Sequence, residues 1–175
     1  MRSVVLCVAV TLLAAPTACT SDAGDAATPP AATATYVVEP NATVVRVVDG
    51  DTVVVDIGDH RETVRLIGID TPETVKPESP VECFGPEASA RTKALLPPGT
   101  EVRLERDAEA RDDYGRLLAY VLLATDGTFV NLLLVDEGLA EPMTFPTNTA
   151  HTAEIVAAAR AAERADVGLW AACGG

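Results

Sequence analysis

The sequence predicts an α+β fold, mainly β, in which a five-stranded barrel carries three helices. Five short runs of β-branched or alternating apolar residues are separated by turn residues. Three further segments begin and end at residues typical of helix termini, and one of them shows a clear apolar face. Short strands with interposed helices are typical of a small, partly open barrel of the OB type.

The first three strands are expected close together. Residues 44–48 form a β-branched run that ends at Asp49-Gly50-Asp51, and residues 53–57 form the second strand. Gly58-Asp59 provides a turn into the third strand, residues 63–69. Gly68 permits a bend within that strand, and Pro72 forces the chain out of the ladder.

The rest of the domain alternates helices and strands. Pro86 suits a first helical position, and Gly138 is a typical residue after a helix end. The predicted elements are a helix at 86–96, strands at 101–105 and 117–123, and helices at 130–137 and 153–165.

The N-terminus has the pattern of a signal peptide over residues 1–18. Arg2 precedes an apolar run from Val4 to Ala15, which is shorter than the roughly 20 residues that span a bilayer. Ala18 followed by Cys19 resembles a bacterial lipobox, in which Cys19 is acylated; ordinary cleavage near Ala18 is the alternative. We therefore expect an exported protein, either a cell-envelope lipoprotein attached to the membrane only by an N-terminal lipid anchor or a secreted protein.

Residues 19–40 are Ala, Thr, Pro, Asp and Gly with few large apolar side chains, and this composition predicts a flexible tether. The folded domain is expected over residues 41–175, as a monomer. Its two cysteines, Cys83 and Cys173, lie in a chain predicted to be exported, where a disulfide between them can persist. Two free thiols are the alternative.

The formal net charge of −13 limits the ways in which the chain can bind a polyanion. Tight non-specific DNA binding relies on Lys and Arg to neutralise phosphates, so the charge argues against it. A small local site remains compatible, because a few Arg and one metal ion can set the field there.

Three motifs carry residues suited to chemistry at a barrel rim. Asp49-Gly50-Asp51-Thr52 is either a simple turn or a pair of carboxylates for a hard cation such as calcium. Arg65 lies within an aliphatic strand that leads to Asp70 and Glu73; the alternatives are an edge-strand arginine and a solvated acidic loop.

The third motif is Asp112-Asp113-Tyr114-Gly115-Arg116, before an apolar strand. Its guanidinium can bind a phosphate through two hydrogen bonds, and Tyr114 can donate another. A polar hairpin loop is the alternative reading.

Across residues 43–170 the chain resembles the staphylococcal nuclease family. The matching segments, in the same order and spacing, are Asp49–Thr52, Arg65–Glu73, Phe84–Ser89, Tyr114–Arg116, Leu118–Tyr120, Val130-Asn131, Gly138–Ala140 and Leu169-Trp170. The resemblance implies an OB-fold barrel, one calcium ion, and cleavage of DNA and RNA to 3′-phosphorylated products. The net charge of −13 further predicts that single strands or frayed duplex are favoured. A catalytically inactive barrel that binds nucleic acid or an envelope protein is the alternative.

The resemblance also implies roles for individual residues. Asp51 and Asp70 would bind calcium through their carboxylates and Thr71 through its backbone carbonyl, with Asp49 beside them. Glu73 would be the general base, while Arg65 and Arg116 would bind the scissile phosphate.

Substrate contacts outside the reacting centre depart from the family pattern. Tyr114 would contact a neighbouring phosphate. Asp113 stands where the family's best-known member has a lysine, and the stretch after Ala140 lacks the tyrosines that stack on a base. Phe145 is the aromatic residue expected to take their place.

Overall fold

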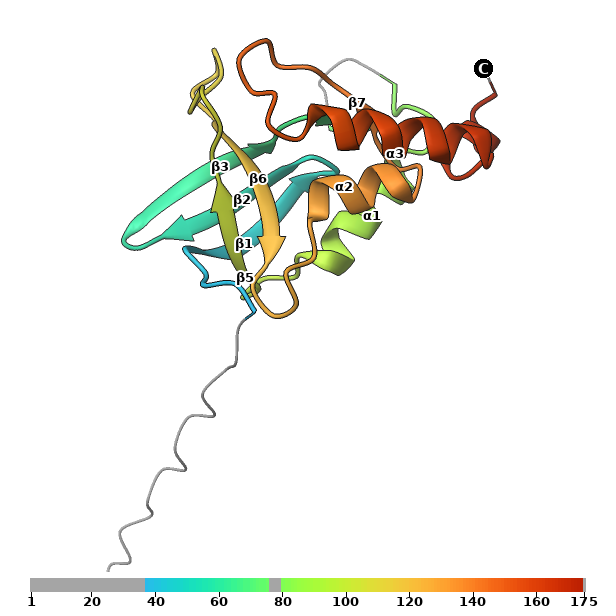
Figure 1. The fold of residues 1–175 in the computed structure, drawn as a ribbon. Helices are drawn as coiled ribbons and strands as arrows, with labels where there is room; N and C mark the ends of the chain where they lie inside the picture. The colour runs from blue at the N-terminus through green and yellow to red at the C-terminus, as the bar shows by residue number, and fades with distance from the viewer. Residues whose placement is uncertain (1–36, 76–79, 175) are drawn as a thin grey trace, which may run out of the picture. The chain divides into compact units, whose positions relative to one another are not determined.

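Five strands close into a barrel in the computed structural model, which describes residues 37–75 and 80–174 (Figure 1). The strands are β1 (Ala42–Asp49), β2 (Thr52–Ile57), β3 (His60–Leu66), β5 (Glu101–Glu105) and β6 (Leu117–Leu123). They follow one another round the barrel in the order β1-β2-β3-β6-β5, and only the β3–β6 pair is parallel. The predicted fold is confirmed.

The barrel is closed rather than partly open. Ala42 and Thr43 at the start of β1 pair with Val102 and Glu101 of β5. The local sequence of these two strands does not show that they meet, because the second and third strands and the first helix separate them in the chain. Apolar side chains that alternate along the strands, such as Val53 and Val55 of β2, are fully buried in the core.

Helices α1 (Gly85–Leu95), α2 (Val130–Asp136) and α3 (Thr152–Arg164) lie on one side of the barrel, with α2 between the other two (Figure 1). Their bounds agree with the predicted helices to within one or two residues. The face of α3 that is buried consists of Ile155, Ala158, Ala159 and Ala162, as its apolar spacing indicates.

The predicted third strand is interrupted, and this interruption shapes the site described below. Gly68 has a φ of 83°, a left-handed conformation that ends β3 at Leu66. The chain resumes as β4 (Ile69–Asp70), which leaves the barrel and pairs with β7 (Glu141–Pro142). Asn131 of α2 supports the bend, because its side chain donates to the carbonyl of Ile67 at 2.9 Å and accepts the amide of Val121 at 2.9 Å.

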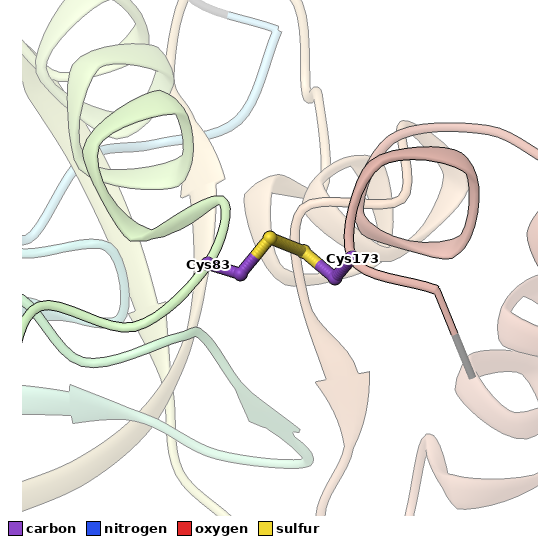
Figure 2. Close-up of a disulfide and its surroundings, with 2 residues drawn as sticks. All are labelled: Cys83 and Cys173. Carbon is purple, nitrogen blue, oxygen red and sulfur yellow. A yellow bond between two sulfur atoms is a disulfide. The ribbon is translucent and has the colours of Figure 1, made fainter.

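A disulfide joins Cys83 to Cys173 across 90 residues of sequence, with Cα atoms 5.8 Å apart (Figure 2). The predicted bridge is confirmed, and the alternative of two free thiols is wrong. It connects the segment before α1 to the end of α4 (Leu169–Ala172), a short helix that the sequence analysis did not predict.

The N-terminal predictions fall mostly outside the described residues. The signal peptide over residues 1–18, the acylated Cys19 and the tether up to residue 36 all lie there. Val37 and Val38 contact the barrel, since both amides donate to the carbonyl of Ala124. The domain boundary at residue 41 stays a prediction. Within residues 37–75 and 80–174, none of the helices has the length and apolar character needed to cross a bilayer.

Candidate active site

One cleft of about 790 Å³ opens where the β1–β2 turn, the β4 segment and the loop before β6 meet. The residues predicted for metal binding, catalysis and substrate contact come from four separate parts of the chain. All of them line this cleft: Asp49, Asp51, Arg65, Asp70, Thr71, Glu73, Tyr114, Arg116 and Phe145.

Arg65 is the buried cation of the cleft. It projects from β3, which lies between β2 and β6, so the alternative of an edge-strand arginine is wrong. Nη1 donates to the carbonyls of Leu66 and Ile69 at 2.6 and 2.8 Å, the two carbonyls that the bend at Gly68 brings together. Nη2 reaches Asp70 Oδ1 at 2.6 Å and Asp51 Oδ2 at 3.1 Å. Arg65 is thus fixed by the backbone on one side and bridges two carboxylates on the other.

Asp51 is held in place from several directions. Oδ1 accepts the hydroxyl of Thr52 at 2.9 Å, and Oδ2 accepts the amide of Thr71 at 3.1 Å. The turn before Asp51 packs closely on Thr71, because a Cβ atom on Gly50 would lie 2.5 Å from Thr71 Oγ1. Glycine at position 50 is therefore required for this approach.

The oxygen atoms near Thr71 fit a hard cation. Thr71 Oγ1 is buried without a hydrogen-bond partner among the described residues, and the carboxylates of Asp51 and Asp70 converge on one positive group, Arg65. Oxygen ligands of this kind suit calcium. Within the described ranges no three His, Cys, Asp or Glu side chains form a metal cluster; the predicted set needs only two carboxylates, since its third ligand is a carbonyl.

Burial raises the pKa of Asp70. Arg65 opposes this rise, while the nearby carboxylates of Asp51, Glu82 and Glu141 add to it. Burial and the neighbouring carboxylates thus make an ionised Asp70 costly, and the guanidinium of Arg65 offsets part of that cost.

Asp49 and Glu73 form a second carboxylate pair. Burial opposes ionisation of Asp49, but hydrogen bonds from Glu73, Thr74 and Gly50 hold the pKa of Asp49 below its usual value. The hydrogen bond with Asp49 raises the pKa of Glu73, against the effect of the Val75 and Thr74 amides. The pKa values of the two carboxyl groups thus shift in opposite directions, that of Glu73 upward and that of Asp49 downward.

Asp49 also anchors the segment that carries Glu73. Its Oδ1 accepts the hydroxyl of Thr74 at 2.6 Å, and its Oδ2 accepts the Thr74 amide at 3.1 Å. Glu73 Oε1 accepts the amides of Thr74 and Val75 at 3.1 and 3.0 Å. The carboxyl group of Glu73 is thereby fixed at the edge of the cleft.

The second guanidinium, Arg116, is oriented by a residue to which the sequence analysis assigned no role. Asp112 Oδ2 accepts Arg116 Nε at 2.7 Å, and Oδ1 accepts the amides of Arg116 and Tyr114 at 2.8 and 3.1 Å. Arg116 also lies over the ring of Tyr114, 5.4 Å from its centroid, and Tyr114 is 84% exposed. The loop thus holds an arginine and an exposed tyrosine side by side.

Two further residues of the cleft, Glu82 and Met143, were not indicated by the sequence patterns. Glu82 accepts the amide of Glu73 at 2.9 Å, and Met143 Sδ lies 3.6 Å from Arg65 Nη2. Neither stands in a recognisable motif, and the contacts of both depend on chain segments that meet only in the folded domain.

The fold and the cleft define a class of protein: a small closed barrel with carboxylates and two guanidinium groups gathered in one cleft. The model of the staphylococcal nuclease homologue family matches residues 63–172. The chain belongs to the staphylococcal nuclease family.

Curated relatives agree with this assignment. The chain is 45% identical over 125 residues to a thermonuclease of Staphylococcus intermedius, covering 71% of this chain and 73% of the relative. It is 42% identical over 127 residues to a thermonuclease of Staphylococcus hyicus, covering 73% of each. It is 48% identical over 101 residues to the endonuclease YncB of Bacillus subtilis, covering 57% of this chain and 46% of the relative. These matches confirm the predicted family and enzyme class, a nuclease acting as a hydrolase.

Proposed function

We propose that the chain is an exported, calcium-dependent endonuclease that hydrolyses phosphodiester bonds of DNA and RNA to 3′-phosphorylated products. The observation that carries the proposal is the single cleft in which two carboxylates, two guanidinium groups and Glu73 meet. The thermonuclease relatives support the same chemistry.

Asp51 and Asp70 would hold the calcium ion through their carboxylates, and Thr71 through its carbonyl, with Asp49 behind them. When bound, the ion supplies positive charge that stabilises the oxygen atoms of the reacting phosphate. The contacts of Asp51 with Thr52 and Thr71 keep its carboxylate in position without reorganisation.

Arg65 and Arg116 bind the scissile phosphate from two parts of the chain. Hydrolysis builds negative charge on the equatorial oxygens, so fixed cations stabilise the transition state more than the bound substrate. Arg65 is oriented by two backbone carbonyls and Arg116 by Asp112. Loss of either guanidinium should slow the reaction by roughly a hundredfold, or about 2–3 kcal/mol.

Glu73 acts as the general base that takes a proton from the attacking water or orients it. The amides of Thr74 and Val75 fix its Oε1, and Asp49 holds Thr74. These contacts restrict the carboxyl group to the cleft, where a water molecule beside the phosphate could meet it.

Substrate contacts beyond the reacting phosphate come from two aromatic residues. The exposed hydroxyl of Tyr114 can donate to a neighbouring phosphate, and the half-buried ring of Phe145 can stack on a base. A base must leave a duplex to stack in this way, so single strands should be preferred. The domain works as a monomer.

Export is supported by the disulfide, since such bonds persist in oxidising compartments. The domain is expected at residues 41–175, behind a signal peptide over residues 1–18 and a tether over residues 19–40. Acylation of Cys19 would make the chain a cell-envelope lipoprotein, and without it the protein would be secreted.

The proposal is tested with the purified chain and a single-stranded DNA oligonucleotide. Digestion should require calcium, stop on addition of a chelator that binds calcium, and leave 3′-phosphate ends detectable by mass spectrometry. Binding of the oligonucleotide without hydrolysis at any calcium concentration would instead favour the catalytically inactive module, which the net charge of −13 does not exclude.

A further inference from the structure

The segment that carries Glu73 is attached to a second segment, residues 82–85, by reciprocal hydrogen bonds. Glu82 Oε2 accepts the amide of Glu73 at 2.9 Å, and the Glu82 amide donates to the carbonyl of Glu73 at 3.0 Å. The position of the Glu73 backbone therefore depends on the position of Glu82.

The two segments are also packed against each other through Gly85. A Cβ atom on Gly85 would lie 2.8 Å from Thr74 Cγ2, 3.0 Å from the carbonyl oxygen of Pro72 and 3.2 Å from that of Glu73. This spacing leaves no room for a side chain. Residues 82–85 thus form the wall against which the catalytic segment rests.

The wall contains a residue in an unfavourable backbone conformation. Phe84, the residue before α1, has a φ of 66° although it is not glycine. A left-handed conformation at such a residue persists only when the surrounding structure enforces it. The neighbours of Phe84 in the chain are Cys83, which is crosslinked, and Gly85, which begins α1.

The other end of the crosslink is firmly held. Gly138 and Gly168 face each other so closely that neither could carry a side chain, and the Leu169 amide donates to the carbonyl of Gly138 at 2.8 Å. The amide of Cys173 donates to the carbonyl of Leu169 at 2.9 Å. Cys173 is therefore tied to the end of α2, and Figure 2 shows the bridge from there to the segment before α1.

We propose that the Cys83–Cys173 disulfide is a positioning element of the active site: it fixes Glu82, Glu82 fixes the backbone of Glu73, and full activity requires the oxidised form. The activity part of this inference rests on the proposed function. Cys83 is exposed, so a dithiol reagent can reach the bond. Thiol–disulfide exchange then converts the bridge to two thiols while the dithiol is oxidised to its own disulfide.

Hydrogen exchange tests the structural part without any assay of activity. The full chain is compared with its bridge intact and after treatment with dithiothreitol, under conditions where circular dichroism shows that the barrel remains folded. The amide of Glu73 should exchange at least about tenfold faster after reduction, whereas amides of β2 such as Val53 should not change. Equal exchange at Glu73 in both forms would overturn the proposal.

Kinetics then tests the functional part. Reduction should lower kcat by about tenfold with little change in KM, because the position of the base changes while the phosphate-binding arginines do not. Calcium affinity, measured by titration calorimetry, should stay the same, since none of Asp51, Asp70 and Thr71 lies in residues 82–85. Reoxidation should restore kcat. An oxidised chain that does not cut at all would refute the proposed function, while the exchange experiment would still decide the positioning role.

A variant with the bridge intact covers the case in which reduction unfolds the domain. Glu82→Ala removes the acceptor for the Glu73 amide and should reproduce both the faster exchange and the lower kcat. Glu82→Gln keeps an acceptor oxygen and should recover most of the loss. Glu163→Ala removes the same charge from an exposed position on α3 and serves as the control. Wild-type exchange and kcat in Glu82→Ala would contradict the proposal.

Discussion

Arg65 is a charged residue whose place in an aliphatic strand is explained by its contacts in the folded domain. A charged residue in an aliphatic strand requires a reason, and together with Asp70 and Glu73 this arginine favours a site at the barrel rim. The structure supplies that reason: the residue is 5% exposed, and its guanidinium is shared between two carbonyls and two carboxylates. The planar fork of arginine is what permits both sets of contacts at once.

Replacing Arg65 by lysine should therefore be severe although the charge is kept. A single ammonium group cannot reach both carbonyls and both carboxylates, so kcat/KM on single-stranded DNA should fall by about a hundredfold or more. Steady-state kinetics with calcium present would measure this. Arg46→Lys, at an exposed position on β1, is the matched control and should cut like the wild type. Near-normal kcat/KM in Arg65→Lys would show that the planar guanidinium group of Arg65 is not needed for cleavage.

Other residues of the cleft carried no usable signal. Glu73 and Arg116 stand in motifs, but Glu82 and Asp112 act only through positions that folding creates. Asp112 could have been noticed four residues before Arg116, yet the same spacing is common in polar hairpin loops. Contacts between segments that are distant in sequence cannot be predicted from local residue patterns.

The short helix α2 covers one side of the barrel and also supports the bend after β3. Its buried Asn131 joins β6 to the bend after β3, through the amide of Val121 and the carbonyl of Ile67. This bend is what turns Ile69 and Asp70 away from the barrel and toward the cleft. A buried asparagine on a small helix thus supports the position of a predicted metal ligand.

Asn131→Leu should lower the free energy of unfolding by about 2–4 kcal/mol, because it leaves a buried donor and a buried acceptor without partners. Urea denaturation followed by circular dichroism gives this value. Thr149→Val, an exposed polar-to-apolar change, should shift it by less than about 0.5 kcal/mol. A loss no larger than that of the control would mean that water replaces both contacts.

The loop between β5 and β6 is attached to the start of α3 by Asp107. The amide of Ala150 is the main cause that lowers the pKa of Asp107, helped by the Ala108 amide and the Tyr120 hydroxyl, while burial opposes it. Burial raises the pKa of Tyr120 to about 12, so its hydroxyl stays protonated and donates to Asp107 at 3.2 Å.

Because the pKa of Asp107 is lower in the folded than in the unfolded state, its contribution is complete above the unfolded value of about 3.9 and is lost as the pH falls through the folded value. The difference in unfolding free energy between the wild type and Asp107→Asn should therefore be constant above about pH 5 and shrink as the pH falls below about 4. Urea titrations at a series of pH values measure it, with Asp59→Asn in the exposed β2–β3 turn as control. A difference in unfolding free energy that does not change with pH would contradict a lowered pKa of Asp107 in the folded state.

Local sequence patterns predict the regular strands and helices but not the pairings that depend on tertiary structure. Strands with β-branched residues and helices bounded by Pro and Gly were predicted within a few residues. The two-residue pair of β4 and β7 was not, since Glu141-Pro142 has no strand character and pairs only because Gly68 directs β4 toward it. Closure of the barrel between β1 and β5 likewise depends on tertiary packing.

For the whole molecule, the net charge of −13 is concentrated in part around the cleft. Seven carboxylates line it, and among the described residues its lining contains just two cationic side chains, Arg65 and Arg116. Substrate must therefore be attracted by very few charges, in contrast to nucleic-acid-binding proteins with broad basic surfaces.

Few phosphate contacts imply a shallow dependence of binding on salt. Arg65 and Arg116 would neutralise one phosphate of a single strand, which corresponds to a slope of about −0.7 in log K against log salt. Binding of an oligonucleotide to Glu73→Gln, followed by fluorescence anisotropy over a series of NaCl concentrations with constant calcium, gives this slope. A slope steeper than about −3 would require further cationic contacts.

The proposed chemistry takes place in one cleft, and a substitution of Arg116 tests this most directly. The side chain of Arg116 is partly exposed and makes few contacts within the domain. The measurement is the single-turnover rate of oligonucleotide cleavage with saturating calcium, for Arg116→Ala and for Arg103→Ala on β5, outside the cleft. We predict a rate about a hundredfold slower for Arg116→Ala and an unchanged rate for Arg103→Ala, with equal melting temperatures. Cleavage by Arg116→Ala at the wild-type rate would contradict the proposal that Arg116 binds the scissile phosphate in this cleft.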